Sequence, residues 1–316
     1  MKNMINRTHI EGFVYEHALE KKVTGEKSKN PGTEFITGTL SIATDNECTN
    51  VVPVHFTYVT ATTAKGGQNA TFGVLNNIVE GVIGTIMKDG KDKAGKVRID
   101  SAIGLNEFYT ERNGNEELVS AKRNEGGFVH TVDVIAEDEN TRNTFEVDMV
   151  ITQVIHVDAD DEKGTPDKAI VKGAIFDFRK SLMPVEFTAL NPNAVAYFEG
   201  LGASQKEPVF TKLWGRQVSQ TIVKTTVEES AFGPDSVRET KSTRRDFVIT
   251  GAAKEPYAWD DEGSITAAEL TEAMANREVY LADVKRRQDE YKASKGAAPA
   301  AAAPAKGGFN FSDEVE

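Results

Sequence analysis

The chain has 316 residues, of which 39% are hydrophobic and 27% are charged, so it can build an ordinary core and is long enough for two domains and a tail. Its net charge of -12 excludes a uniformly basic nucleic-acid-binding protein, although binding depends on where the charges lie. The single cysteine, Cys48, excludes an internal disulfide and favours a reducing compartment. The N-terminus lacks the apolar stretch of a signal peptide, and no run is long enough to cross a bilayer, so we expect a cytoplasmic protein.

The first half is dominated by strand-like runs that are rich in Val, Ile, Thr and aromatic residues. These runs are His9–Tyr15, Phe35–Ala43, Val51–Val59, Val97–Leu105, Phe128–Ile135 and Phe145–Val157. A helix is expected at about Ala70–Ile83, because apolar residues such as Leu75 and Ile78 recur there at helical spacing. We predict a first domain over residues 1–157.

The second half repeats this order after a polar linker at residues 158–168, which carries Gly and Pro. Its predicted strands are Ala169–Arg179, Pro184–Leu190, Val209–Thr226 and Arg245–Ala252. Between the second and third of these, Asn191 and Pro192 are typical of an N-cap followed by Pro at the first helical position. We predict a second domain over residues 169–259.

The two halves are interpreted as an internal repeat. Ile10–His17 aligns with Val171–Phe178, since both read apolar, charged, Gly, any residue, β-branched, aromatic, acid, ring. Five strands with a helix before the fourth form the OB arrangement. The predicted fold is therefore mostly β, with two OB-type β-barrels in tandem, each with a short helix, plus a C-terminal helix and a disordered tail.

The C-terminal region divides into three segments. Residues 260–294 are expected to form an amphipathic helix, which begins with a capping box from Thr266 to Glu269. Residues 295–308 contain Ala, Pro, Gly and Lys without a bulky apolar side chain, so we expect a flexible linker. Residues 309–316 form an acidic-aromatic tail that suits a basic, apolar-floored pocket on another protein; the alternative is a disordered end without a role. The predicted partner-binding residues are Phe309, Phe311, Asp313, Glu314 and Glu316.

Two or three rings in a row define the candidate binding face of each half. On a strand, alternate residues share a face, so Phe13 and Tyr15 lie opposite the aliphatic residues, as do Phe176 and Phe178. If the aliphatic face fills the barrel, these rings point outward, where stacking of bases contributes roughly 1–3 kcal/mol each. The alternative is that the rings pack under a loop or under the partner domain. Trp214 is read as a further stacking platform or as a buried residue.

Basic residues flank these rings in three segments that we expect to be loops bordering an OB groove: Glu20–Pro31, Glu111–Gly127 and Thr225–Arg245. Any single lysine in them could equally be a solvated surface residue. The predicted DNA-binding cations are Lys21, Lys22, Lys27, Lys29, Arg112, Lys122, Arg123, Arg179, Lys180, Arg216, Arg244 and Arg245.

Catalytic and metal-binding motifs are missing from the sequence. The histidines are scattered, and no nucleophile elbow, phosphate-binding loop or zinc spacing is present. Asp158–Glu162 resembles a calcium loop only faintly, because the required Gly and terminal Glu are missing. We expect no enzymatic activity, no cofactor and no metal.

Several segments together are similar to phage-encoded single-stranded DNA-binding proteins. They are the first strand IEGFVYEHAL, the Lys-rich hairpin, the segment GTEFITGTLSIAT, the Ala/Pro/Gly linker and the acidic-aromatic end. In the bacterial family the tail ends in acids and a Pro-Phe pair, whereas here the phenylalanines precede the acids and the last residue is Glu316. The resemblance implies an OB fold and a non-catalytic role in DNA replication, recombination and repair.

We therefore expect sequence-tolerant binding and protection of single-stranded DNA in the host cytoplasm, with the tail recruiting replication and recombination proteins. A homo-oligomer is left open. One alternative is a β-rich structural or assembly protein, such as a virion component, that uses its aromatic faces as protein interfaces. A third reading is an OB module that binds an oligosaccharide or a protein.

Overall fold

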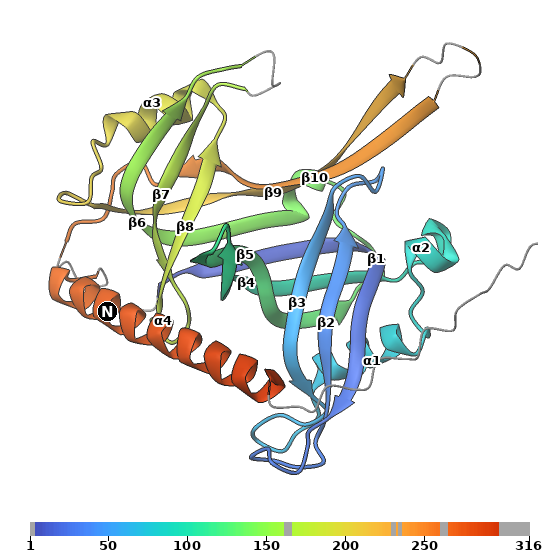
Figure 1. Cartoon of the computed structure of the whole chain (residues 1–316). Coiled ribbons are helices and arrows are strands. Elements are labelled where there is room, and N and C mark those ends of the chain that lie inside the picture. Colours follow the sequence, from blue (N-terminus) through green and yellow to red (C-terminus); the bar gives the residue numbers. More distant parts are fainter. Residues whose placement is uncertain (1–3, 161–165, 229–231, 233–235, 260–264, 297–316) are drawn as a thin grey trace, which may run out of the picture.

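The computed structural model describes residues 4–160, 166–228, 232, 236–259 and 265–296, and of residues 220–228, 239–244 and 294–296 it describes the backbone alone (Figure 1). The described chain is mostly β, as predicted. None of its described helices combines the length and the apolar character that a bilayer span requires.

The first barrel is closed by five strands. They are β1 (Asn6–Val23), β2 (Glu34–Ala43), β3 (Val51–Thr60), β4 (Lys96–Arg112) and β5 (Asn115–Thr131). β1 pairs with β2 and β4, β2 pairs with β3, and β4 pairs with β5, all antiparallel, while a short parallel pairing of β3 with β5 closes the barrel. Between β3 and β4 lie α1 (Ala70–Val79), α2 (Ile86–Asp89) and the short helix η1 (Lys91–Lys93).

The second barrel repeats this pairing strand for strand. Its elements are β6 (Asn143–Val157), β7 (Lys168–Phe176), β8 (Leu182–Ala189), α3 (Pro192–Gly200), β9 (Val209–Glu228) and β10 (Ser236–Ala252). β6 pairs with β7 and β9, and a parallel pairing of β8 with β10 closes the barrel. The prediction of two OB-type barrels, each with a helix before its fourth strand, is confirmed.

The alignment behind the predicted repeat is wrong. It matches part of β1, the first strand of one barrel, with part of β7, the second strand of the other. The equivalent of β1 is β6, which also pairs with β1 and so joins the barrels. Both matched segments carry a glycine because a Cβ at Gly12 or Gly173 would lie 2.0 Å from a carbonyl oxygen of the neighbouring strand. The predicted domain limits 1–157 and 169–259 place β6 in the first domain, whereas its pairing with β7 and β9 makes it the first strand of the second barrel.

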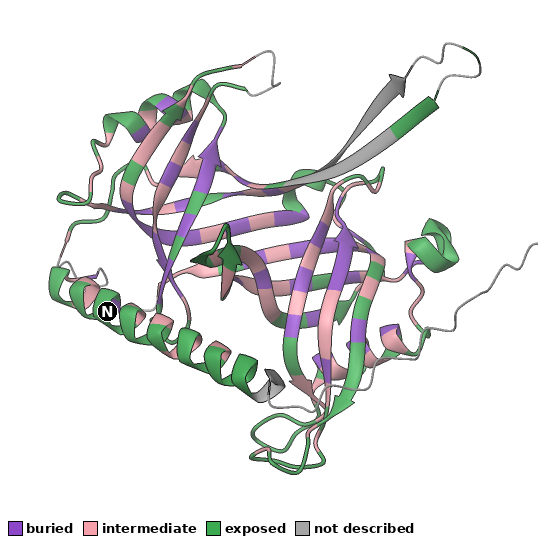
Figure 2. Cartoon of the chain, in the orientation of Figure 1, coloured by how far each residue is buried: buried purple, intermediate pink, exposed green. Residues whose placement is uncertain are grey.

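Each barrel has its own apolar core, which follows the alternation of buried residues along the strands (Figure 2). Ile10, Leu40 and Phe56 belong to the first core, and the stacked rings of Phe145 and Phe187 belong to the second. The aliphatic face of each barrel therefore points inward, as predicted.

The predicted caps are confirmed, whereas one helix end is not. The Asn191 side chain accepts the Asn193 N–H at 2.8 Å, and Thr266 and Glu269 form a reciprocal capping box. The helix expected to reach residue 83 ends at Val79, because Gly81 adopts a positive φ of 75°.

Two of the segments predicted as basic loops are largely strands. β4 and β5 continue to a two-residue turn at Asn113–Gly114, with φ of 51° and 78°. Likewise, β9 continues to Glu228 and β10 begins at Ser236, and these two residues pair with each other. The Asn-Gly pair is the usual signature of such a hairpin turn. Figure 1 shows the β9–β10 ribbon projecting from the barrels.

A buried polar network also joins the barrels. The side-chain amides of Gln217 on β9 and Asn124 on β5 bond each other at 2.7 and 2.8 Å. The carbonyl oxygen of Gln217 accepts from Asn50 at 3.2 Å and from Asn143 at 2.5 Å. These amides are paired with one another and shielded from water. Because hydrogen bonds are directional, the network fixes one placement of the barrels, which buried contact surface alone would not do.

Candidate nucleic-acid interface

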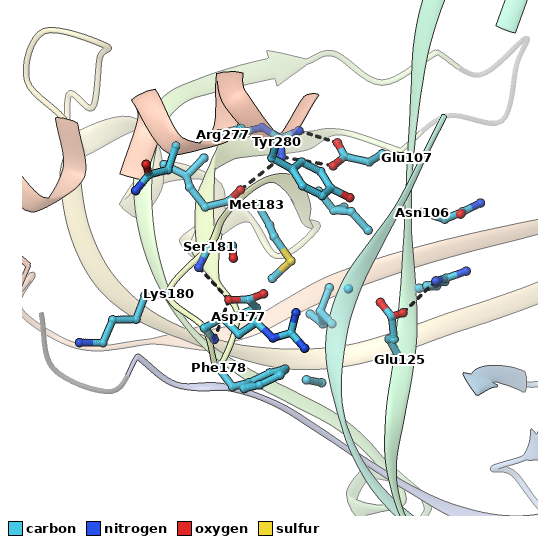
Figure 3. Close-up of a pocket in the computed structure, with 18 of the residues that line it drawn as sticks. Asn106, Glu107, Glu125, Asp177, Phe178, Lys180, Ser181, Met183, Arg277 and Tyr280 are labelled. Atoms are coloured by element: carbon cyan, nitrogen blue, oxygen red, sulfur yellow. Dashed lines mark hydrogen bonds and ion pairs between the residues drawn. The ribbon is translucent and has the colours of Figure 1, made fainter. Parts of the chain in front are cut away.

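Two hollows on the surface meet at one arginine. The first, which we call the barrel groove, has a volume of about 450 Å³. The second, the inter-barrel cleft, has a volume of about 720 Å³ and is shown in Figure 3. The barrel groove is lined by Glu16, His17, Ala18, Thr39, Ser41, Pro53, His55, Arg123 and Arg245. Arg123 lines both hollows, so they adjoin at this residue, and we call the two together the path.

The floor of the barrel groove is the outer face of β1, β2 and β3. Because Leu40 and Ile42 point into the core, Thr39 and Ser41 of the same strand point outward. Thr39 pairs across the sheet with His55 on β3, and their side chains approach to 3.3 Å. One wall comes from the second barrel, through Arg245 of β10, so both barrels build the groove.

The positive charge of the barrel groove comes from its arginines. Burial lowers the pKa of His17 and of His55, and the nearby positive charges of Lys88 and Arg123, respectively, lower them further. Both imidazoles are therefore neutral near pH 7. Glu16 is the carboxylate in the lining.

Arg123 has an unused donor at the junction of the two hollows. Its NH2 group pairs with Glu125 at 2.9 Å. Its Nε is buried and has no hydrogen-bond partner among the described residues. A buried donor without a partner is costly, and a ligand would reach this atom only after a movement of the side chain, because the atom is closed to solvent.

An aromatic pair lies on the same outer face of β2 and β3. The ring centroids of Phe35 and Tyr58 are 4.7 Å apart, and Tyr58 is 49% exposed. Sequence reasoning missed this pair and the two groove histidines. For His55 the signal was present, because Val52, Val54 and Phe56 alternate inward. Tyr58 has the same even spacing and faces outward because the register shifts between Phe56 and Val59.

The β7–β8 turn brings three predicted residues together beside the inter-barrel cleft. Phe178 is 88% exposed, and the guanidinium of Arg179 lies 5.0 Å from its ring centroid. The Asp177 carboxylate holds the turn by accepting the N–H groups of Arg179 at 2.8 Å and Ser181 at 2.7 Å. Lys180 completes the exposed tip. A ring and two cations are therefore presented to solvent by a fixed turn.

Cations outnumber carboxylates around the inter-barrel cleft, and two of the carboxylates are neutralised. The cations are Arg123, Arg179, Lys180, Arg277 and Arg287, and the carboxylates are Glu107, Glu125 and Asp177. Glu107 pairs with Arg277 at 2.5 Å, and Glu125 pairs with Arg123 (Figure 3). These pairs also neutralise Arg277 and Arg123, and Arg287 pairs with Asp283, so the net positive charge of the cleft is small.

The outward orientation predicted for Phe176 is wrong, and the rings of Phe13 and Tyr15 are half-buried. Phe176 is fully buried, because Ile265 and Ala273 of the C-terminal segment cover its face of β7. Lys91 lies over the Phe13 ring at 5.1 Å. A base cannot stack on Phe176.

Lys122 is not the solvated groove lysine that the sequence suggested. Its Nζ lies 4.8 Å and 4.9 Å from the ring centroids of Phe187 and Phe247 and donates to the Glu186 carbonyl oxygen. Burial lowers its pKa to about 8. Lys122 therefore joins the barrels and is not placed to meet a phosphate.

The other predicted cations fall into separate places. Lys21 pairs with Glu34 and Glu80, and Lys22 pairs with Glu20. Lys27 and Lys29 are exposed on the β1–β2 loop, and Arg112 is exposed at the tip of the β4–β5 ribbon.

Trp214 and Arg216 lie on β9 and line neither hollow. Trp214 is 41% exposed and packs over Gly251, where a Cβ would lie 2.4 Å from its ring. Arg216 donates to Asn140. The side chain of Arg244 and the tail residues Phe309–Glu316 lie outside the described part of the chain.

One group of side chains has metal-ligand character. Donor atoms of His156, Asp158 and Asp167 lie within 4.8 Å of one another, and all three residues are exposed. His156 also approaches Glu199 at 2.6 Å, and the bonds to Glu199 and Asp167 raise its pKa. These contacts already satisfy both ring nitrogens, so the group is a hydrogen-bonded cluster within the described residues.

The fold and the site define an OB-type β-barrel protein with a cationic surface path between two barrels. The chain belongs to the YorF family, whose sequence profile matches residues 5–287. No curated protein matches the sequence. Among solved structures, a deletion mutant of the single-stranded DNA binding protein from Thermus aquaticus is similar, with a TM-score of 0.45 and 8% identity, over 82% of this chain and 97% of that chain. A likeness at this level does not bear on what this chain binds.

Proposed function

We propose that this protein binds single-stranded DNA, with little sequence preference, along the path formed by the barrel groove and the inter-barrel cleft. The observation that carries the proposal is that an exposed ring, Phe178, lines the cleft beside Arg179, while a second, Tyr58, lies outside the lining on a strand that forms the groove floor. Tyr58 stands on the face that forms the groove floor, Phe178 stands beside the cleft, and Arg123 lies where the hollows meet.

Each group has a physical role in this proposal. Tyr58 and Phe178 offer ring faces on which bases of any sequence can stack. Arg123, Arg245 and Arg179 meet phosphates. Because the molecule as a whole carries a charge of -12, long-range repulsion opposes the approach of DNA, and binding depends on these local contacts.

The remaining parts of the proposal concern the setting of this binding. We propose a non-catalytic role in phage DNA replication and recombination, in which the bound strand is protected in the host cytoplasm. The tail residues Phe309 and Phe311, with the acids after them, would recruit partner proteins. The resemblance of the sequence to phage-encoded single-stranded DNA-binding proteins supports this part.

The test is a fluorescence anisotropy titration of labelled oligo-dT, about 30 nucleotides long, at two salt concentrations. We expect binding that weakens with salt. The double variant Tyr58→Ala, Phe178→Ala should bind at least about 10-fold more weakly, since stacking on each ring contributes roughly 1–3 kcal/mol. The matched control is Phe128→Ala, because Phe128 is 70% exposed and lines neither hollow.

Equal weakening by the control, or no binding by the unaltered protein at low salt, would contradict the proposal. In the latter case, concentration-dependent self-association measured by sedimentation would favour the alternative of an assembly protein.

A further inference from the structure

The C-terminal helix α4 (Ala267–Gly296) is fixed to the second barrel by apolar burial at its start. Ala273 and the preceding Ile265 are buried in a cluster with Phe176 of β7 and Leu182 of β8, and Leu270 packs against it. This end of the helix therefore moves with the second barrel.

The later turns of α4 hold the first barrel through polar bonds with the β4–β5 ribbon. The Gln288 side chain accepts the Tyr109 N–H at 2.8 Å and donates to the Tyr109 carbonyl oxygen, so it pairs with the free edge of β4 as a neighbouring strand would. Lys285 pairs with Glu116 on β5 at 2.6 Å.

Arg277 contacts both barrels at once. Its guanidinium pairs with Glu107 of β4 at 2.5 and 3.2 Å and donates to the Leu182 carbonyl oxygen of β8 at 3.3 Å. The side chains of Arg277 and Glu107 are 13% and 2% exposed. A charge pair this well shielded is strongly directional, and removing one partner leaves the other charge buried.

We infer that α4 is a clasp between the barrels, that is, a helix bonded to both of them. Arg277 is the positioning residue that keeps the barrel groove and the inter-barrel cleft at a fixed distance and orientation. A continuous helix is stiff, so apolar anchoring at one end and polar bonds at the other set the angle between the barrels together with the β1–β6 pairing and the Gln217–Asn124 amides. For DNA, the inference rests on the proposed function, since a strand that engages both hollows gains affinity only if their spacing is fixed.

The first experiment needs no DNA. Distances are measured by spin-label spectroscopy between Cys residues introduced at Lys65 and Lys206, exposed positions on the first and second barrels, in a Cys48→Ser background. Arg277→Ala should broaden the distance distribution. The matched control is Arg286→Ala, because the ion pairs of Arg286, to Asp283 and Glu290, stay within α4. Arg277→Lys, which keeps one charge–charge interaction, should restore part of the narrow distribution.

If Arg277→Ala lowers the content of folded protein in circular dichroism, Gln288→Ala serves as the second variant, since it removes only the bonds with Tyr109. A distance distribution that stays as narrow as that of the control in the folded variant would overturn the clasp.

The second experiment compares oligo-dT of about 8 and about 30 nucleotides, lengths that one barrel and both barrels can hold. Gln288→Ala, at a residue that lines neither hollow, should weaken binding of the longer strand on the order of 10-fold and leave the shorter strand unchanged. Equal weakening of both lengths would indicate a general loss of structure and overturn the inference. If neither strand binds the unaltered protein, the proposed function fails, while the distance measurement still decides the clasp.

Discussion

The two barrels share one strand order but differ in what covers their outer faces. The outer side of β2 in the first barrel carries Thr39 and Ser41 and lines the barrel groove. The outer side of β7 in the second barrel carries Ala174 and Phe176, which are buried beneath the C-terminal segment. The same fold therefore offers a polar, open face in one copy and a face whose apolar part is covered in the other, where Lys172 and the turn after β7 reach solvent.

The sharpest way to test this comparison uses two rings two residues apart. Phe176→Ala should lower the free energy of unfolding by about 3–5 kcal/mol, because it opens a cavity under α4. Phe178→Ala should change stability by less than about 0.5 kcal/mol, as expected of an exposed residue, yet weaken oligo-dT binding. Chemical denaturation and anisotropy on both variants check this pair. The comparison fails if the folded fraction of Phe176→Ala loses affinity as Phe178→Ala does.

Lys122 provides a pH test of the contact between the barrels. Its pKa in the folded protein is about 8, whereas a lysine in an unfolded chain titrates near 10.4, so the unfolded state binds more protons between these values. Stability should therefore rise with pH from about 8 to 10.4, by up to about 3 kcal/mol, and should not gain from this residue below pH 8. Urea denaturation at several pH values checks the rise. Lys122→Met should remove it, and an unchanged slope in this variant would contradict the assignment.

The smallest expected effect concerns the arginines of the barrel groove. Arg123→Gln and Arg245→Gln should each reduce the salt dependence of binding, by about 0.7 in the slope of log affinity against log salt for each phosphate that the variant no longer neutralises. Arg216→Gln is the matched control, since Arg216 lines neither hollow. The slope is measured by anisotropy at four salt concentrations. Slopes that remain equal in all three variants would argue against phosphates in the groove.

Much of the fold could be predicted from local patterns. Alternating Val, Ile and aromatic residues located the strands, and the Asn-Pro and Thr–Glu caps located the starts of α3 and α4. The extension of β4 and β5 could also have been predicted, because Asn113–Gly114 specifies a tight hairpin.

The covering of one face could not be predicted in the same way. Phe176 and Phe178 lie on the same side of the sequence pattern, but one is buried by residues about 90 positions later in the chain, as its packing with Ile265 and Ala273 shows. The burial of Lys122 could not be predicted either, because the rings that cover it belong to the other barrel. Period-two reasoning identifies a face, whereas only the tertiary structure decides what lies over it.

Photo-crosslinking of oligo-dT in which thymines are replaced by 5-iodouracil, followed by mass spectrometry of the crosslinked peptides, tests the central claim most directly. Bases stacked on rings crosslink efficiently to them, so we expect crosslinks at Tyr58 on β3 and Phe178 in the β7–β8 turn. Crosslinks confined to Trp214 on β9 or to Phe128 on β5 would contradict the path between the barrels.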